Sequence, residues 1–219
     1  MIRRLLLAMT LARPGVFRVP TIFCRRDATV TSRHEAPSAD IEHCLEQSAR
    51  IGWPTIGWLP VKTVWDWAVK CQLFFDDFAS TPAGRGLAAF SHLTYSERGR
   101  NAAAEDLFWA MLRLEALYTA GGEESITRQL IRKTELLLGP QEKFRSVVKR
   151  MYDYRSRFIH GQISFPSAYC EYEGTRSFES YVDEIGEASD MALAILIATL
   201  QKMAREDRTS VRFEYILSP

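Results

Sequence analysis

The chain has 219 residues, of which 47% are hydrophobic and 25% charged, an ordinary composition for a globular protein. This composition excludes a disordered, collagen-like or low-complexity chain, and no apolar run approaches the ~20 residues of a membrane-spanning helix. The net charge is +1, from 28 basic and 27 acidic residues, so no overall field attracts nucleic acids or membranes. We therefore expect no membrane association, and any nucleic-acid binding must come from a local patch.

The first segment of the chain is basic. Residues 1–34 contain seven arginines and a single acid, Asp27. The apolar stretch Leu5–Ala12 is short for a signal peptide, and Arg13-Pro14 stands where cleavage would fall. A mitochondrial presequence, a remnant of an upstream domain and an arm that contacts RNA or an acidic partner remain open. We favour a poorly ordered or partly extended basic arm over residues 1–38.

The rest of the chain carries helical patterns. Apolar residues recur at three- and four-residue steps, as at Leu107, Met111 and Leu114, and Gly139-Pro140 ends one such segment. No alternation of strands and helices is present, so a parallel sheet is excluded. The predicted fold is all-α, an antiparallel helical bundle with an irregular N-terminal segment. The predicted helices are residues 39–50, 61–78, a short one within 80–101, 102–119, 123–138, 141–160 and 178–205.

These patterns divide the chain into four parts. After the arm, helices in residues 39–100 are expected to pack on a helical core formed by residues 101–207. Residues 208–219 form a C-terminal extension, in which 211–216 alternate as in a lone strand or a docked tail. Four tryptophans lie between Trp53 and Trp67, a cluster typical of a core or a subunit interface.

Several kinds of chemistry lack their motifs. The four cysteines form no C-x-x-C pair, which disfavours a zinc site and suits free thiols in a reducing cytoplasm. The nucleotide-binding glycine motifs, H-E-x-x-H and G-x-S-x-G are absent as well. We therefore expect a cytoplasmic protein with no metal site and no cofactor.

Two later segments carry opposite charge. Residues 143–157 hold six bases against one acid, whereas residues 171–190 hold seven acids against one base. One interpretation is that these two segments face each other within the fold. The other is that the bases lead phosphates toward a site.

The basic segment contains the most specific pattern of the chain. Met151–Gly161 reads Met-Tyr-Asp-Tyr-Arg-Ser-Arg-Phe-Ile-His-Gly, in which four residues separate Arg155 from His160. The spacing alone is unspecific, since six residues also separate Arg85 from His92. The context says more: an earlier helix carries Leu114-Glu115-Ala-Leu117, and an Arg/Lys-Leu-Leu helix ending in glycine follows it.

This combination resembles the HEPN superfamily, in particular its Apea-like branch, over residues 85–205 and most strongly over 107–161. The resemblance implies an all-α bundle, frequent homodimers and, in active members, a metal-independent endoribonuclease built on an Arg-x4–6-His motif. Many members belong to bacterial defence or toxin systems, and others are non-catalytic binding modules. Arg155 and His160 match the motif residues, and Ser156 matches the polar residue after the arginine. The tyrosine that follows the histidine in some branches is absent here.

These residues suit RNA cleavage. A guanidinium such as Arg155 holds phosphoryl oxygens, and an imidazole such as His160 exchanges protons near neutral pH. A second histidine would come from a second copy of the chain. Glu115 either pairs with Arg155 and orients it or is a solvated glutamate. In a purely structural interpretation, Arg155 holds Asp153 or Glu115 in a network within the fold and His160 caps the helix. Tyr152 either stacks on bases or packs in the protein, and Arg157 is a candidate phosphate ligand.

Two functions thus remain. The first is a homodimeric ribonuclease with RNA as its substrate. The second is a non-catalytic HEPN module that binds a partner protein or nucleic acid.

Overall fold

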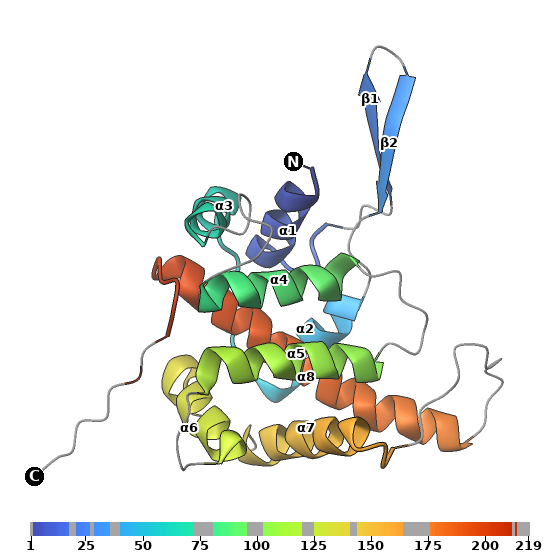
Figure 1. Ribbon diagram of the computed structural model, residues 1–219, viewed down its shortest axis with the longest axis vertical. Helices are drawn as coiled ribbons and strands as arrows, with labels where there is room; N and C mark the ends of the chain where they lie inside the picture. Colours follow the sequence, from blue (N-terminus) through green and yellow to red (C-terminus); the bar gives the residue numbers. More distant parts are fainter. Residues whose placement is uncertain are drawn as a thin grey trace, which may run out of the picture.

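The computed structural model describes residues 2–17, 21–26, 29–35, 40–71, 81–95, 103–119, 125–140, 144–163, 176–211 and 213. Within them the chain forms eight helices and one two-stranded hairpin, so the predicted helical bundle is confirmed (Figure 1). The elements are α1 (Ile2–Ala12), β1 (Thr21–Arg26), β2 (Thr29–Glu35), α2 (Asp40–Ile51), α3 (Val61–Lys70), α4 (Pro82–Tyr95), α5 (Ala103–Tyr118), α6 (Ile126–Leu138), α7 (Phe144–Ile159) and α8 (Arg176–Arg205).

Helix α8 is the centre of the bundle. It is the longest helix described, with 30 residues, and it runs diagonally through the molecule in Figure 1. All residues from Met191 to Gln201 are buried, whichever way they face around the helix. A helix that is apolar all round must be covered on every side. Helices α1 to α7 all contact α8, with α5 and α2 forming its most extensive contacts.

Helix α1 supplies part of this cover. Its residues Leu7, Leu11 and Ala12 are buried in the same hydrophobic core as α8, and α1 packs against α3 and α8. The prediction of a poorly ordered arm is therefore wrong for residues 2–17. The apolar stretch that resembles a targeting sequence is a core helix, because the buried end of α8 would otherwise face water.

The hairpin β1–β2 follows α1. Its strands pair antiparallel, from Thr21 opposite Glu35 to Arg26 opposite Thr29, with an irregularity between Cys24 and Arg25. In Figure 1 it projects away from the helices. Sequence analysis expected at most a partly extended segment here and did not identify a hairpin.

One buried glutamine ties three parts of the chain together. Gln201 on α8 is 2% exposed. Its Nε2 donates to the carbonyl oxygens of Leu11 and Gly57, at 2.8 Å each, and its Oε1 accepts from the Gly57 N–H at 3.1 Å. The end of α1 and the loop after α2 are thus anchored to α8. Leu11 lies in the last turn of α1, where carbonyls lack partners within the helix.

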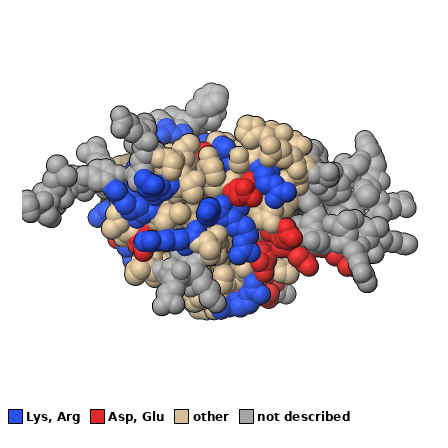
Figure 2. Space-filling model, turned by 90° about the horizontal axis from the view of Figure 1, so that it is seen from below, with Lys and Arg blue, Asp and Glu red and all other residues tan. Residues whose placement is uncertain are grey.

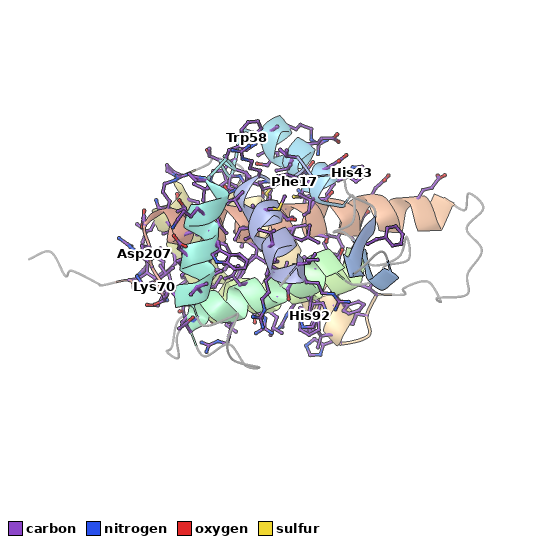
Figure 3. The ribbon with its side chains drawn as sticks, turned by 90° about the horizontal axis from the view of Figure 1, so that it is seen from above. Phe17, His43, Trp58, Lys70, His92 and Asp207 are labelled. Carbon is purple, nitrogen blue, oxygen red and sulfur yellow. The ribbon has the colours of Figure 1, made fainter. Side chains whose placement is uncertain are left out.

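The tryptophan cluster divides between core and surface. Trp53 and Trp67 are buried, as a core interpretation predicts, whereas Trp58 is 70% exposed. The Trp67 indole donates to the Arg208 carbonyl at 2.7 Å, and Lys70 pairs with Asp207 (Figure 3). These bonds dock the residues that follow α8 onto α3.

The C-terminal extension docks further along the bundle. The Ala83 N–H donates to the Thr209 carbonyl at 3.0 Å, and the Phe213 ring lies 6.1 Å from the Tyr118 ring. Most of the alternating segment 211–216 lies outside the described residues, so the predicted strand is not described.

The oppositely charged segments meet, as one interpretation predicts. Arg150 on α7 pairs with Glu187 on α8 at 3.5 Å, and Arg50 on α2 pairs with the same carboxylate at 2.9 Å. Tyr154 on α7 donates to Glu184 on α8. The face-to-face interpretation is therefore confirmed for these pairs.

In the part of the chain that the structure describes, no helix combines the length and the hydropathy needed to cross a membrane.

Replacing Leu11 by alanine tests whether α1 belongs to the core. Leu11 is fully buried, so Leu11→Ala is expected to lower the free energy of unfolding by about 2–5 kcal/mol in urea denaturation. Leu5→Ala on the same helix is the matched control, since Leu5 is 42% exposed, and should cost less than about 1 kcal/mol. Equal effects of the two substitutions would show that α1 is not packed in solution.

The Gln201→Leu variant keeps the side-chain volume but removes all three hydrogen bonds. Because the Leu11 and Gly57 groups then remain buried without partners, stability should fall by about 2–4 kcal/mol. Thermal unfolding measures the loss. Asp183→Asn, exposed at the other end of α8, should leave the melting temperature nearly unchanged. A neutral Gln201→Leu would contradict the anchoring role.

Candidate functional site

Arg155 and Glu115 form an ion pair between α7 and α5. The Arg155 Nη2 donates to the Glu115 Oε2 at 3.2 Å, and the two side chains are 20% and 12% exposed. Both residues lie at the edge of the core. Met151, one turn before Arg155 on α7, is fully buried, and so is Leu114, the residue before Glu115 on α5. The predicted Glu115–Arg155 pair is confirmed, and the solvated glutamate is excluded.

Burial shapes the electrostatics of this pair. Loss of solvent raises the pKa of the Glu115 carboxyl, and the positive charge of Arg155 opposes that rise. The pairing is incomplete. Glu115 Oε1 and Arg155 Nε are both buried without a hydrogen-bond partner among the described residues. The contact thus orients the guanidinium through one hydrogen bond and leaves donor capacity unused.

Tyr152 lies beneath the guanidinium. The Arg155 Cζ is 5.9 Å from the centre of the Tyr152 ring, and Tyr152 is partly buried against the core. Two roles were predicted for Tyr152, stacking on a base and packing within the protein, and the structure shows packing. The ring also limits the orientations open to Arg155, since a guanidinium is attracted to an aromatic face.

His160 stands in the turn that ends α7. Its backbone N–H donates to the Ser156 carbonyl at 3.0 Å, and the Gln162 N–H donates to the Arg157 carbonyl at 2.8 Å. Gly161 has φ +64°, the left-handed conformation that commonly closes a helix. Helix α7 ends at Ile159, one residue before the predicted end. The His160 side chain is exposed and makes no hydrogen bond or ion pair with the described residues.

Arg155 and His160 therefore have different surroundings. Arg155 is held against α5, whereas His160 is exposed to solvent beyond the end of the helix. No hydrogen bond within the described chain joins them. His160 comes after the end of α7, so the helical rotation of about 100° per residue does not fix its direction relative to Arg155.

The remaining predicted site residues lie on the outer side of α7. Asp153 pairs with Arg157 at 3.8 Å across one turn, with 63% and 45% of the side chains exposed. Asp153 is thus not the partner of Arg155. Ser156 is partly buried, and its carbonyl supports the turn at His160. The structure therefore brings Arg155, Glu115 and Tyr152 together, with Asp153 and Arg157 as a separate surface pair.

A basic surface surrounds these residues. Figure 2 looks at the molecule from below, where α6 and α7 lie in Figure 1, and shows Lys and Arg side chains gathered with acidic side chains to one side. Lys149 is exposed and makes no ion pair with the described residues. The exposed basic residues of the two helices are Arg128, Arg132, Arg145, Lys149, Arg150 and Arg157.

No metal site accompanies the cluster in the described residues. There, no group of three or more His, Cys, Asp and Glu side chains is placed to hold a metal ion. Cys44 and Cys71 are buried and form no disulfide, and burial raises the pKa of Cys71 to about 12. Cys71 is therefore protonated near neutral pH and is not a nucleophile.

Sequence reasoning missed a second cluster of basic and aromatic residues, formed where α4 packs on α5. Arg85 and His92 come from α4, and Trp109 and Arg113 from α5. The Arg85–His92 spacing was the available signal, but such spacing arises often by chance in an arginine-rich chain. Only the packing of α4 on α5 adds the tryptophan and the second arginine.

The chain matches no protein-family model, no curated protein and no solved structure at a significant level. The HEPN assignment thus remains a prediction from the motif residues.

The ion pair predicts a pH-dependent stability effect. In Arg155→Met, Glu115 keeps its burial but loses its cation, so its folded-state pKa rises further. Near neutral pH this leaves an unpaired buried carboxylate, and stability should fall by about 1–3 kcal/mol. Below the ordinary glutamate pKa of 4.5, Glu115 is protonated in both states, so the loss should shrink as the pH falls.

Urea denaturation near neutral pH, repeated below the ordinary pKa of glutamate, measures this dependence. The double variant Glu115→Gln/Arg155→Met removes the buried charge and should recover most of the stability near neutral pH. The same loss at both pH values would contradict the role assigned to Glu115.

Proposed function

We propose that the chain is a metal-independent endoribonuclease of the HEPN type, in which Arg155 binds the scissile phosphate and His160 transfers protons. The observation that carries this proposal is the ion pair at 3.2 Å that holds Arg155 on Glu115 while 20% of the arginine side chain stays exposed. A guanidinium held in one orientation meets a phosphate without first losing side-chain freedom, which favours binding of the transition state.

The chemistry needs a base, an acid and a cation. A neutral imidazole takes the proton of the ribose 2′-hydroxyl, and the 2′-oxygen attacks the phosphorus. The guanidinium stabilises the extra negative charge of the phosphorane, and the bond from phosphorus to the 5′-oxygen breaks. An imidazolium gives that 5′-oxygen its proton. The products are a 2′,3′-cyclic phosphate and a 5′-hydroxyl.

The need for two proton-transfer groups, one base and one acid, favours a homodimer. His34, His43 and His92 belong to β2, α2 and α4, whereas the main packing partners of α7 are α8, α5 and α6. A second copy of the chain would bring another His160 and another Arg155 to one cleft. Each copy would then contribute an acid or a base, and the separation of Arg155 from His160 within one chain would be no obstacle.

The exposed bases of α6 and α7 suit the approach of RNA. A polyanion gains affinity from each lysine or arginine that neutralises a phosphate. Lys149 and Arg157 lie on α7, the helix that carries Arg155. They are therefore placed to contact the phosphates of an RNA strand that leads to the site. The resemblance also implies a setting for this activity, a bacterial defence or toxin system.

A second candidate is a non-catalytic HEPN module that binds a partner protein or nucleic acid. The observation that favours it is the exposed His160 ring, which no hydrogen bond to a described residue orients. Catalytic imidazoles are commonly held by a partner that sets the tautomer.

RNA cleavage in excess EDTA tests the choice between the two. Wild type should cut end-labelled RNA into fragments with 2′,3′-cyclic phosphate ends, and His160→Ala should reduce the rate by about 10²–10⁴-fold. Arg155→Lys keeps the charge but loses the planar fork, so a large loss is expected there too. Arg205→Gln, an exposed arginine at the end of α8 and outside the basic surface of α6 and α7, is the control and should retain most of the activity.

The outcomes separate the candidates. A requirement for divalent metal, or fragments with 3′-hydroxyl ends, would contradict the mechanism. Absence of cleavage by pure wild type, with RNA or protein binding retained, would support the binding module.

A further inference from the structure

A cavity lies between the end of α1, helix α2 and the loop that follows α2. Its volume is about 360 Å³, a size typical of sites for small organic molecules. Leu45 of α2 and Pro54 and Ile56 of the loop make its wall largely apolar, and Ser48 and Thr55 add hydroxyl groups. Among the described residues that line the cavity, none carries a charge. The cavity therefore suits the apolar part of a small molecule.

The loop that forms one side of this cavity is held in place by hydrogen bonds. The Ser48 Oγ donates to the Pro54 carbonyl at 2.5 Å. Both the N–H and the carbonyl of Gly57 are bound by the buried amide of Gln201. Because the wall is ordered before a ligand arrives, binding does not have to supply the free energy of ordering it. A loop fixed in this way to a rigid scaffold is a common place for a binding site.

Trp58 stands at the mouth of the cavity. Its side chain lines the cavity and yet is 70% exposed. Its indole N–H makes no hydrogen bond with the described residues. Figure 3 shows Trp58 at the edge of the molecule beside α2. An indole in this position offers a flat apolar face to a second ring that enters the cavity.

Arg13 adds a positive charge to this mouth. It directly precedes Pro14, which lines the cavity, and its Cζ is 5.6 Å from the centre of the Trp58 ring. The Arg13 side chain is exposed and makes no ion pair with the described residues. The attraction to the aromatic ring limits the orientations of the guanidinium without using its hydrogen-bond donors. These donors match a carboxylate, which a guanidinium binds through two parallel hydrogen bonds.

The charge at the mouth indicates how many negative charges the ligand carries. One guanidinium beside an uncharged wall balances a single negative charge. An RNA strand carries a charge on every phosphate and gains affinity only where several cations meet it. The cavity therefore favours a small monoanion over a nucleic acid.

We infer that this cavity binds a small monoanion with a flat ring, of the aromatic carboxylate class, with the ring packed against Trp58 and the carboxylate paired with Arg13. This site goes beyond the proposed function and does not depend on it. Arg155 and Glu115 belong to α7 and α5, and Figure 1 shows α1 and α7 at opposite ends of the molecule. Binding at the cavity is therefore measured separately from cleavage.

The indole signals of the protein test this inference directly. The chain has five tryptophans, so a ¹H–¹⁵N spectrum of labelled protein shows five indole N–H signals. Trp58→Phe identifies the Trp58 signal by its loss, and Trp109→Phe does the same for Trp109 on α5. Titration of wild type with 2-naphthoate should shift the Trp58 signal to saturation and leave the Trp109 signal in place.

A neutral probe and a pair of arginine variants test the role of the charge. The probe 2-naphthamide has the same rings without the negative charge and should bind at least about tenfold more weakly. Arg13→Gln should weaken the binding of 2-naphthoate by about tenfold and remove the difference between the two probes. Arg128→Gln removes an equal charge from the exposed surface of α6 and, as the matched control, should bind both probes like wild type.

Three results would overturn the inference. The first is a Trp58 signal that 2-naphthoate does not shift in a saturable way at millimolar concentration. The second is equal affinity of wild type for the acid and the amide. The third is an Arg13→Gln protein that binds like Arg128→Gln, with its remaining indole signals at their wild-type positions to show that it is folded.

Discussion

The burial of α8 on all sides is the constraint from which the rest of the fold follows. Its residues Met191 to Gln201 expose almost nothing, and an apolar helix surface left open to water would cost about 25 cal/mol for each Å². Seven helices therefore surround it, including α1, which brings the beginning of the chain into the core. The one buried amide of this region, Gln201, then serves to close the ends of α1 and of the loop after α2.

The packing of helices on α8 also decides which charged groups are partly buried at helix–helix contacts. Helix α5 lies on α8 and has α4 on one side and α7 on the other. Its charged residues therefore stand at two helix–helix boundaries, where they are partly desolvated. Glu115 meets a cation across one boundary and is paired, whereas at the other boundary burial and the charge of Arg85 lower the pKa of Arg113. At the boundary with α7, the paired carboxylate orients Arg155.

Sequence patterns and structure agree best where periodicity is strong. The core helices α5 to α8 have the expected places, and the pairing of Glu115 with Arg155 is one of the two interpretations of Glu115 that the sequence left open. The role of residues 2–17 was missed, because an eight-residue apolar stretch among arginines fits a targeting sequence, an arm or a core helix equally well. The all-round apolar character of Met191–Leu200 was the available clue, since it demanded more cover than the predicted core helices supply.

Local rules determined helices α2 to α8, the end of α6 at Gly139 and the turn that places His160 after Ile159, because these depend on neighbouring residues alone. Only the tertiary structure decided that Arg155 faces Glu115 rather than Asp153, and that His92 and Arg113 both meet Trp109. Such contacts join residues tens of positions apart, and they depend on how helices rotate about their axes when they cover α8. That rotation is set by the sum of many small packing energies, which no single motif encodes.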